Sequence, residues 1–281
     1  MVEQAARSTS LDPTPSPPRR QPGVLETTLE SFDWKAIHAL SREDVLVIRV
    51  KQFVSDELCE ILSRKAEDEI GYKSYLNVPS VRRIGMAFYE TEGKADIIRT
   101  YFETARQNIL AFRDACAPYC SPIDTLRCTL DEIWPAGANL QTLTGRKMFV
   151  GLSRMVRPGT TFLAHHDLFQ EDAPGEPEAN DLKAQFGANV YIKVPAEGGE
   201  LLMWQKEIPT PVFDRMRNGE YGLDISVLGQ PDLSVKPNRG DLLIFNSRKM
   251  HAVGPGKEIN RLALACFVAY RGIHKPLTFW S

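Results

Sequence analysis

Residues 240–270 read GDLLIFNSRKMHAVGPGKEINRLALACFVAY, and this stretch decides the fold class. It holds two short apolar runs, GDLLIF (240–245) and LALACFVAY (262–270). A loop that contains glycine and proline separates them. Short runs of branched and aromatic residues bounded by turn residues are typical of buried β-strands. We therefore expect two strands here, joined through a loop that carries His251.

The same pattern recurs upstream. Turn sequences such as RPGT, PAEGG and PNRG lie between short apolar runs throughout the second half of the chain. Many short strands separated by such turns are typical of a barrel or a double-sheet jelly roll. Four further runs are predicted strands: MFVGLSRMV (148–156), TFLAHHDLF (161–169), ANVYIKV (188–194) and GELLMW (199–204).

The first half of the chain is mostly helical in pattern. Apolar residues recur every three or four positions between 95 and 117, as they do on one face of a helix. Two more helices are predicted, from the N-cap Ser55 to about Glu69 and from Ile123 to Ile133. VLVIRV (45–50) and RRIGMAFYE (82–90) are predicted strands. Helices that precede the strands predict an α+β fold, with the helices packed on one face of the β unit.

Residues 1–23 form a proline-rich tail that includes SLDPTPSPPRRQPG. Such a composition buries little apolar surface, so we predict a disordered tail. No internal repeat and no second low-complexity linker follows, which predicts one domain over residues 24–281.

Composition limits the classes of partner. The 281 residues carry a net charge of −2, and this leaves no basic surface for nucleic acid. The longest apolar run is too short to span a bilayer, and the first residues lack the order of a signal peptide. The five cysteines form no CxxC motif and are interpreted as buried reduced thiols. We expect a cytoplasmic protein that binds neither nucleic acid nor membrane; its oligomeric state is left open.

The segment FLAHHDLF (162–169) places two histidines and an aspartate side by side. Side chains of a strand alternate between its faces, so His165 and Asp167 share one face and His166 points to the other. A lone HxD triplet is a weak signal, since polar residues often end a buried strand. His251 strengthens it by adding a second imidazole from another strand. Two imidazoles and one carboxylate are the ligands of a facial triad that leaves positions open on Fe(II).

These motifs carry a resemblance to a known family. The HxD, the GDLLIFNS strand before His251, and Arg261 ten residues later resemble the Fe(II)/2-oxoglutarate-dependent oxygenases, which have a double-stranded β-helix (jelly-roll) core. VPAEGGELLMW, FRDACAPYCSPIDTLRCTLDEIW and KPLTFWS are similar to the aliphatic halogenases of hapalindole-type alkaloid pathways and to the β-hydroxylases of N-acyl amino acids. Those halogenases have glycine where this chain has Asp167. The carboxylate occupies the halide position, so the resemblance implies hydroxylation and not halogenation.

The resemblance also implies roles for residues. His165, Asp167 and His251 would hold the iron, and Arg261 would bind the distal carboxylate of the cosubstrate 2-oxoglutarate as a bidentate pair. Arg154 is a second candidate anchor, with a structural ion pair as its alternative. Asn189 and Tyr191 are candidate contacts of 2-oxoglutarate if their strand turns that face inward. Dioxygen is the other cosubstrate. Candidate substrate contacts are Tyr75, Arg82, Arg83, Phe88 and Phe169.

The expected reaction is hydroxylation of an unactivated C–H bond in a small molecule, with release of succinate and CO2. The substrate expected from the relatives is an amino-acid derivative or a natural-product intermediate. Desaturation, epoxidation and cyclisation use the same cofactors and stay open. Two alternatives are a protein or peptide substrate and a non-catalytic jelly-roll binding protein. Residues 170–185 and 205–239, the latter with a short helix near Val212 to Arg217, are predicted lids.

Overall fold

The computed structural model describes residues 23–67, 73–74 and 81–281. Except for Gly23, the predicted proline-rich tail lies outside the described residues, and so does the candidate substrate contact Tyr75.

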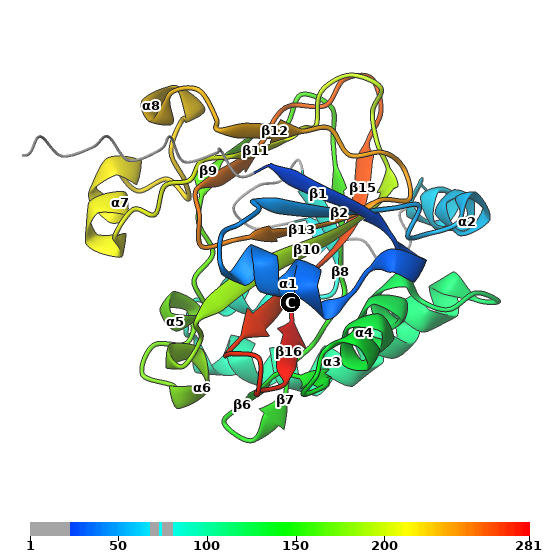
Figure 1. The fold of residues 1–281 in the computed structure, drawn as a ribbon, viewed down its shortest axis with the longest axis horizontal. Coiled ribbons are helices and arrows are strands. Elements are labelled where there is room, and N and C mark those ends of the chain that lie inside the picture. Colours follow the sequence, from blue (N-terminus) through cyan, green and yellow to red (C-terminus); the bar gives the residue numbers. More distant parts are fainter. Residues whose placement is uncertain (1–22, 68–72, 75–80) are drawn as a thin grey trace, which may run out of the picture.

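The largest element is a ten-stranded mixed sheet (Figure 1). Its two longest strands, β10 and β15, lie side by side and antiparallel at its centre. The strands follow in the order β1 (Val24–Thr28), β2 (Val47–Lys51), β13 (Leu242–Asn246), β10 (Ala184–Lys193), β15 (Arg261–Tyr270), β8 (Leu152–Val156), β4 (Val81–Ile84) and β3 (Lys73–Ser74), while β16 (Leu277–Trp280) pairs with β15 and with β5 (Ala138–Leu140).

A second sheet of four short strands faces the first. One cavity is lined by residues of both sheets, so the two sheets enclose it. The second sheet has the order β12 (Leu233–Val235), β11 (Leu201–Met203), β14 (His251–Val253) and β9 (Phe162–His165), and a separate hairpin joins β6 (Thr142–Leu143) to β7 (Arg146–Lys147). This confirms the predicted α+β class with a double-sheet jelly-roll core.

Four helices cover the outer face of the large sheet (Figure 1). Ile37, Leu58 and Leu126 from three of these helices belong to one buried cluster that also contains Val190 and Leu264 of the sheet. The helices are α1 (Trp34–Ser41), α2 (Asp56–Glu67), α3 (Ala95–Cys116) and α4 (Pro122–Ile133). Shorter helices are η1 (Leu29–Ser31), η2 (Phe88–Thr91), α5 (Phe169–Asp172), α6 (Pro177–Asn180), α7 (Thr210–Arg217) and α8 (Ile225–Leu228).

Alternation along the two central strands divides the core from the cavity. Ala188, Val190 and Ile192 of β10 pack in the helix-side cluster, while Gly187, Asn189 and Tyr191 line the cavity. This is the period-two pattern of a strand that is buried on both faces. The sequence left open which face of this strand points inward. In the structure, Asn189 and Tyr191 point into the cavity.

Several predicted elements need correction. RRIGMAFYE is not one strand: β4 ends at Ile84, and residues 88–91 form the 3-10 helix η2. Gly85 explains the break, because it has φ +88° and a Cβ there would lie 2.4 Å from the Phe149 ring. TFLAHHDLF is also shorter than predicted, since β9 ends at His165. Two cysteines predicted to be buried, Cys120 and Cys128, are exposed.

The predicted helix near residues 212–217 is present as α7 and begins two residues earlier. Strand β1 and helix α1 were not predicted. Within the described residues, no helix combines the length and apolar character needed to cross a bilayer.

Candidate metal centre

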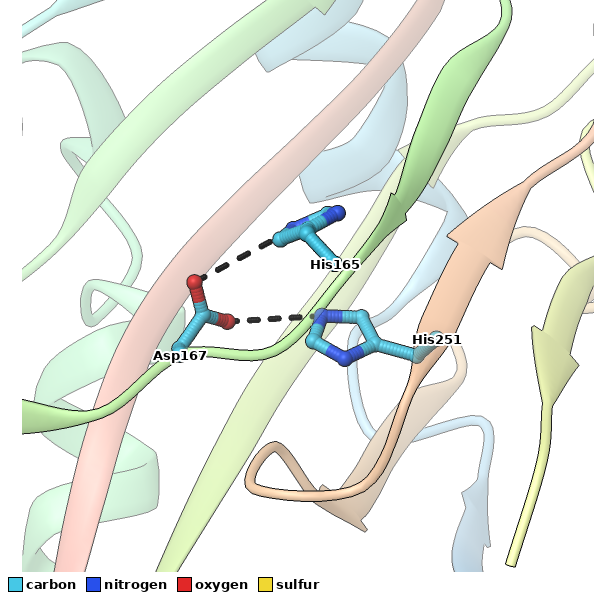
Figure 2. A group of neighbouring side chains, drawn as sticks. All are labelled: His165, Asp167 and His251. Carbon is cyan, nitrogen blue, oxygen red and sulfur yellow. Dashed lines mark ion pairs between the residues drawn. The ribbon is translucent and has the colours of Figure 1, made fainter. Parts of the chain in front are cut away.

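Three potential ligands meet where β9 and β14 lie side by side (Figure 2). His165 is the last residue of β9 and is paired directly with His251, the first residue of β14. Asp167 follows β9 by two residues, and its backbone N–H donates to Ser247 O at 2.8 Å. Asp167 Oδ2 lies 3.3 Å from His251 Nε2, and its Oδ1 lies 3.9 Å from His165 Nε2. One ligand atom from each residue lies within 4.8 Å of the others.

Backbone carbonyls orient both imidazoles. His165 Nδ1 lies 2.8 Å from Leu163 O, and His251 Nδ1 lies 3.0 Å from Lys249 O. A carbonyl oxygen can only accept a hydrogen bond, so each Nδ1 carries the proton and donates it. With the proton on Nδ1, each ring can present the lone pair of Nε2 to the common point. A metal-ligating histidine commonly has its other ring nitrogen fixed in this way.

The protonation states suit a cation. Burial and, to a smaller extent, the neighbouring His251 lower the pKa of His165 to about 4, so this ring is neutral near pH 7. Burial alone would raise the pKa of Asp167, but the hydrogen bond from His251 and the charges of His165, His251 and Arg154 outweigh it, and the pKa is about 2. Two imidazoles and one carboxylate fit a divalent transition metal with open coordination positions.

A cavity lies beside these ligands and is lined by residues of both sheets. Its polar lining includes all four predicted cosubstrate contacts from the large sheet: Arg154, Asn189, Tyr191 and Arg261. The structure therefore brings these four side chains into the same cavity as the three potential metal ligands.

Arg261 stands at the start of β15, with its guanidinium carbon 5.5 Å from the centre of the Phe162 ring. Burial lowers the pKa of its guanidinium, and Arg154 lowers it further. Burial also raises the pKa of the Tyr191 hydroxyl, although Arg261 and a hydrogen bond with Asn189 oppose this shift. The site is a buried cationic pocket with hydrogen-bonding side chains, which suits a small anion.

Arg83 lies in β4, the strand that pairs with the part of β8 that contains Arg154. Strand β4 places it opposite Arg154, and its Nη2 lies 2.6 Å from Glu90 Oε2. Arg83 also donates to the carbonyl of Gly85. Burial raises the pKa of Glu90, and Arg83 opposes that rise. This buried ion pair flanks the cavity, and Arg83 itself is not part of the lining.

Two predicted substrate contacts lie in the core. Phe88 and Phe169 have ring centres 6.2 Å apart and belong to one buried cluster with Trp280. Neither lines the cavity. Their packing accounts for their burial, and a contact with substrate stays a prediction, as it does for Arg82. His166 points away from the ligand cluster, as predicted, and its ring centre lies 4.5 Å from that of Phe213 in α7.

Sequence reasoning missed three contributors to the site. Phe245 packs against His251 with ring centres 5.0 Å apart, and a Cβ on Gly187 would lie 2.7 Å from the Phe245 ring. Lys249 is buried between Glu43 and Glu207, at 2.8 and 2.9 Å. The pattern of β10 could have flagged Gly187, because a glycine inside a strand often marks a close approach. No local pattern identifies Lys249, since its partners are distant in sequence.

Comparison with known proteins agrees with this geometry. The profile of the 2OG-Fe(II) oxygenase superfamily matches residues 150–269, which include all three candidate ligands and Arg261. L-gamma-glutamyl-L-propargylglycine hydroxylase of Streptantibioticus cattleyicolor is 32% identical over 162 residues. That alignment covers 57% of this chain and 59% of the relative, so the chain matches about three fifths of the length of that protein.

Solved structures share the fold. An N-substituted L-amino acid dioxygenase from Burkholderia ambifaria AMMD aligns with a TM-score of 0.61 and 19% identity, over 88% of this chain and 91% of that one. Its complex with alpha-KG aligns with a TM-score of 0.60 and 18% identity, over 88% and 90% of the two chains. At this identity, the likeness establishes the common fold.

Proposed function

We propose that the protein is an Fe(II)- and 2-oxoglutarate-dependent oxygenase that hydroxylates a small molecule, since residues 150–269 match the profile of the 2OG-Fe(II) oxygenase superfamily. The observation that carries this proposal is the orientation of the two imidazoles. Both Nε2 atoms face the Asp167 carboxylate, and a cationic cavity lies beside them. A purely structural zinc site would use four protein ligands, whereas the cluster in the described residues has three.

Each polar group has a role in this proposal. His165, Asp167 and His251 hold Fe(II) on one side only, which leaves positions for 2-oxoglutarate and dioxygen. The loaded metal supplies the oxidation, coupled to conversion of 2-oxoglutarate to succinate and CO2. Arg261 binds the distal carboxylate of the cosubstrate as a bidentate pair. Tyr191 and Asn189 line the same wall and hydrogen-bond to each other.

We further propose that the substrate is an amino-acid derivative. The relative from S. cattleyicolor is named for a gamma-glutamyl amino acid, and the structural relative for N-substituted L-amino acids. A role in natural-product biosynthesis and a cytoplasmic location fit this substrate class. The hydroxylation step follows from the carboxylate at position 167, which occupies a ligand position that would otherwise be open to halide.

Succinate formation tests the proposal. Anaerobically purified protein would be loaded with Fe(II) and 2-oxoglutarate, mixed with a panel of N-acyl and gamma-glutamyl amino acids, and exposed to air. Substrate-stimulated succinate in the wild type, and none in His251→Ala, is the expected result. Products would be analysed by mass for the addition of one oxygen atom. If the wild type binds neither Fe(II) nor 2-oxoglutarate, the proposal is wrong.

A further inference from the structure

The last strand of the small sheet has a second neighbour besides β14. β9 stands at the end of the four-stranded order. Ala164 in β9 exchanges two backbone hydrogen bonds with Leu223: the N–H of Ala164 donates to Leu223 O at 2.8 Å, and the N–H of Leu223 donates to Ala164 O at 2.7 Å. This is the closed pair of an antiparallel ladder. Residues 221–223 therefore extend the small sheet by one short step, on the side of β9 away from His251.

Tyr221, in the same segment, contacts the strand of the metal ligand in two ways. Its hydroxyl oxygen accepts a hydrogen bond from the backbone N–H of Leu163 at 2.7 Å. Leu163 is also the residue whose carbonyl oxygen lies 2.8 Å from His165 Nδ1. The Tyr221 ring lies edge-on to the His165 ring, with ring centres 6.0 Å apart, an arrangement that aromatic rings favour. One tyrosine side chain thus fixes the backbone beside the ligand and one side of the ligand ring.

Gly222 lets the segment approach β9 closely. A Cβ at this position would lie 2.8 Å from Ala164 O and 2.8 Å from the Leu163 side chain, closer than non-bonded atoms pack. A glycine in extended chain often marks such a close approach of two backbones. The three consecutive residues therefore contact β9 by different means: a hydroxyl, a bare backbone and a pair of ladder hydrogen bonds. Their agreement in one place shows that the segment fits this strand.

The segment is anchored in the insertion between β11 and β12, which carries α7 and α8 beside the small sheet (Figure 1). Leu223 belongs to a buried cluster with Ala164 of β9, Trp204, and Phe213 of α7. The indole N–H of Trp204 donates to Gly229 O at 3.0 Å, which joins the residue after α8 to the residue after β11. Packed side chains therefore set the position of the segment, and the segment can hold β9 in place.

β9 is a short strand with irregular pairing. It has four residues and ends at His165, and its pairing with β14 shifts register between His251 and Val253. Asp167 and His251 have backbone partners of their own in the loop before β14. The contacts made by residues 221–223 therefore act first on His165 among the three candidate ligands.

Resting on the proposed function, we propose that Tyr221 is a positioning residue for the metal ligand His165, and that residues 221–223 act as a short edge strand that aligns the end of β9. The insertion at 205–239, predicted as a lid, then has a second role as support for the metal site. Residues that orient a metal ligand typically change metal affinity by about 10- to 100-fold when substituted. Because Tyr221 acts through Leu163 and through ring packing, we expect the lower end of this range. The alternative is that Tyr221 only stabilises the insertion.

Metal binding without oxygen tests the inference. Tyr221→Phe removes the hydroxyl and keeps the ring, so the N–H of Leu163 loses its acceptor. We expect the Kd for Fe(II), measured by equilibrium dialysis, to rise about 10-fold. Protein loaded with Co(II) should also show a changed visible absorption spectrum, because the d–d bands of this ion follow the geometry of its ligands. A tyrosine that only stabilised the insertion would shift thermal unfolding and leave both measurements unchanged.

A second variant and a control separate the position of the ligand from general loosening. Gly222→Ala keeps the hydroxyl but pushes the segment away from β9, so it should raise the Kd for Fe(II) to a similar extent. Arg217→Met is the matched control. Arg217 donates to Glu220 O, next to Tyr221, and to Asp214, so these hydrogen bonds stay inside the insertion. Its substitution should keep the Kd for Fe(II) within about 3-fold of the wild type.

Two results would overturn the inference. A folded Tyr221→Phe protein keeps the Kd for Fe(II) within about 3-fold of the wild type, or Arg217→Met raises that Kd as much as Tyr221→Phe does. Thermal unfolding would check that each variant is folded, and if Tyr221→Phe is not, Gly222→Ala decides by the same limits. Failure of the proposed function looks different, because the wild type itself would then bind neither Fe(II) nor 2-oxoglutarate.

Discussion

The two sheets that enclose the cavity are built in different ways. The central strands of the large sheet, β10 and β15, have ten residues each and are buried along nearly their whole length. The strands of the small sheet have three or four residues. The large sheet positions its polar residues by regular alternation, while individual contacts with Leu163 O and Lys249 O orient the imidazoles of the small sheet. Local hydrogen bonds therefore position the metal ligands of the small sheet, whereas the packed core positions the cavity-facing polar residues of the large sheet.

This difference predicts separable defects. Changes in the small sheet should weaken metal binding without affecting anion affinity directly. Changes among the cavity-facing residues of the large sheet should weaken anion binding and spare the metal.

The largest effect is expected for His251→Ala. It removes one of three protein ligands, and we expect Fe(II) affinity to fall by more than about 100-fold, beyond the 10- to 100-fold typical of a residue that only supports a ligand. Equilibrium dialysis without oxygen measures the affinity. His274→Ala is the matched control, because that histidine is exposed and far from the cluster in sequence. Equal metal affinity in the two variants would remove His251 from the site.

Arg261→Gln should affect the cosubstrate and not the metal. Loss of a charge-assisted bidentate pair is expected to raise the Kd for 2-oxoglutarate by about 30- to 100-fold. Fe(II) affinity measured without 2-oxoglutarate should stay within about 3-fold of the wild type. A matching loss of metal affinity would show that the small sheet and the large sheet are coupled in binding.

Acid should destabilise the metal-free protein through the small sheet. The pKa of His165 is about 4 in the folded chain and 6.5 when unperturbed, so the unfolded chain binds the extra proton first as pH falls. The contribution of His165 is constant above about pH 6.5 and falls from there toward pH 4, by about 2 kcal/mol between pH 7 and 5. The lowered pKa of Asp167 adds a further loss between its unperturbed value of 3.8 and about 2.

Urea unfolding at several pH values measures this slope. His165→Gln should flatten it in part, since the pKa of His166 is lowered as well and contributes in the same direction. An unchanged slope in His165→Gln would show that His165 is not the group that titrates.

Most of the large sheet and the candidate ligands could be predicted from the sequence. Runs such as LALACFVAY are continuous and apolar because β15 is buried on both faces, and this signal is local. The common side of His165 and Asp167 followed from strand alternation, although β9 ends at His165. Asp167 still lies on the same side as His165, because its backbone N–H donates to Ser247 O and this hydrogen bond keeps the chain beside β14.

The remaining features depend on contacts between distant segments. RRIGMAFYE has strand composition, but Gly85 lies against Phe149 and turns the chain. Phe88 packs beside Tyr101 and Phe102, and its neighbours in the sequence give no sign of these contacts. Lys249 showed no signal because its partners Glu43 and Glu207 lie far away in sequence. Such residues are identified only once the chain is folded.

Substitution of Lys249 is the most specific test of the small sheet and the one with the smallest expected effect. Its ammonium is buried and joins Glu43, in the turn before β2, to Glu207, which follows β11. Its backbone carbonyl accepts the hydrogen bond that orients His251. Lys249→Met leaves two half-exposed glutamates that water can solvate, so the expected loss of unfolding free energy is only about 1–2 kcal/mol.

The loosened turn should also let the His251 ring reorient, and Fe(II) affinity should then fall by about 10-fold. Lys257→Met is the matched control, because its pair with Glu197 is exposed on both sides and should contribute little. Metal affinity would be compared with stability for both variants. A Lys249→Met protein that loses stability but keeps full metal affinity would mean that the carbonyl holds His251 without help from the buried ion pairs.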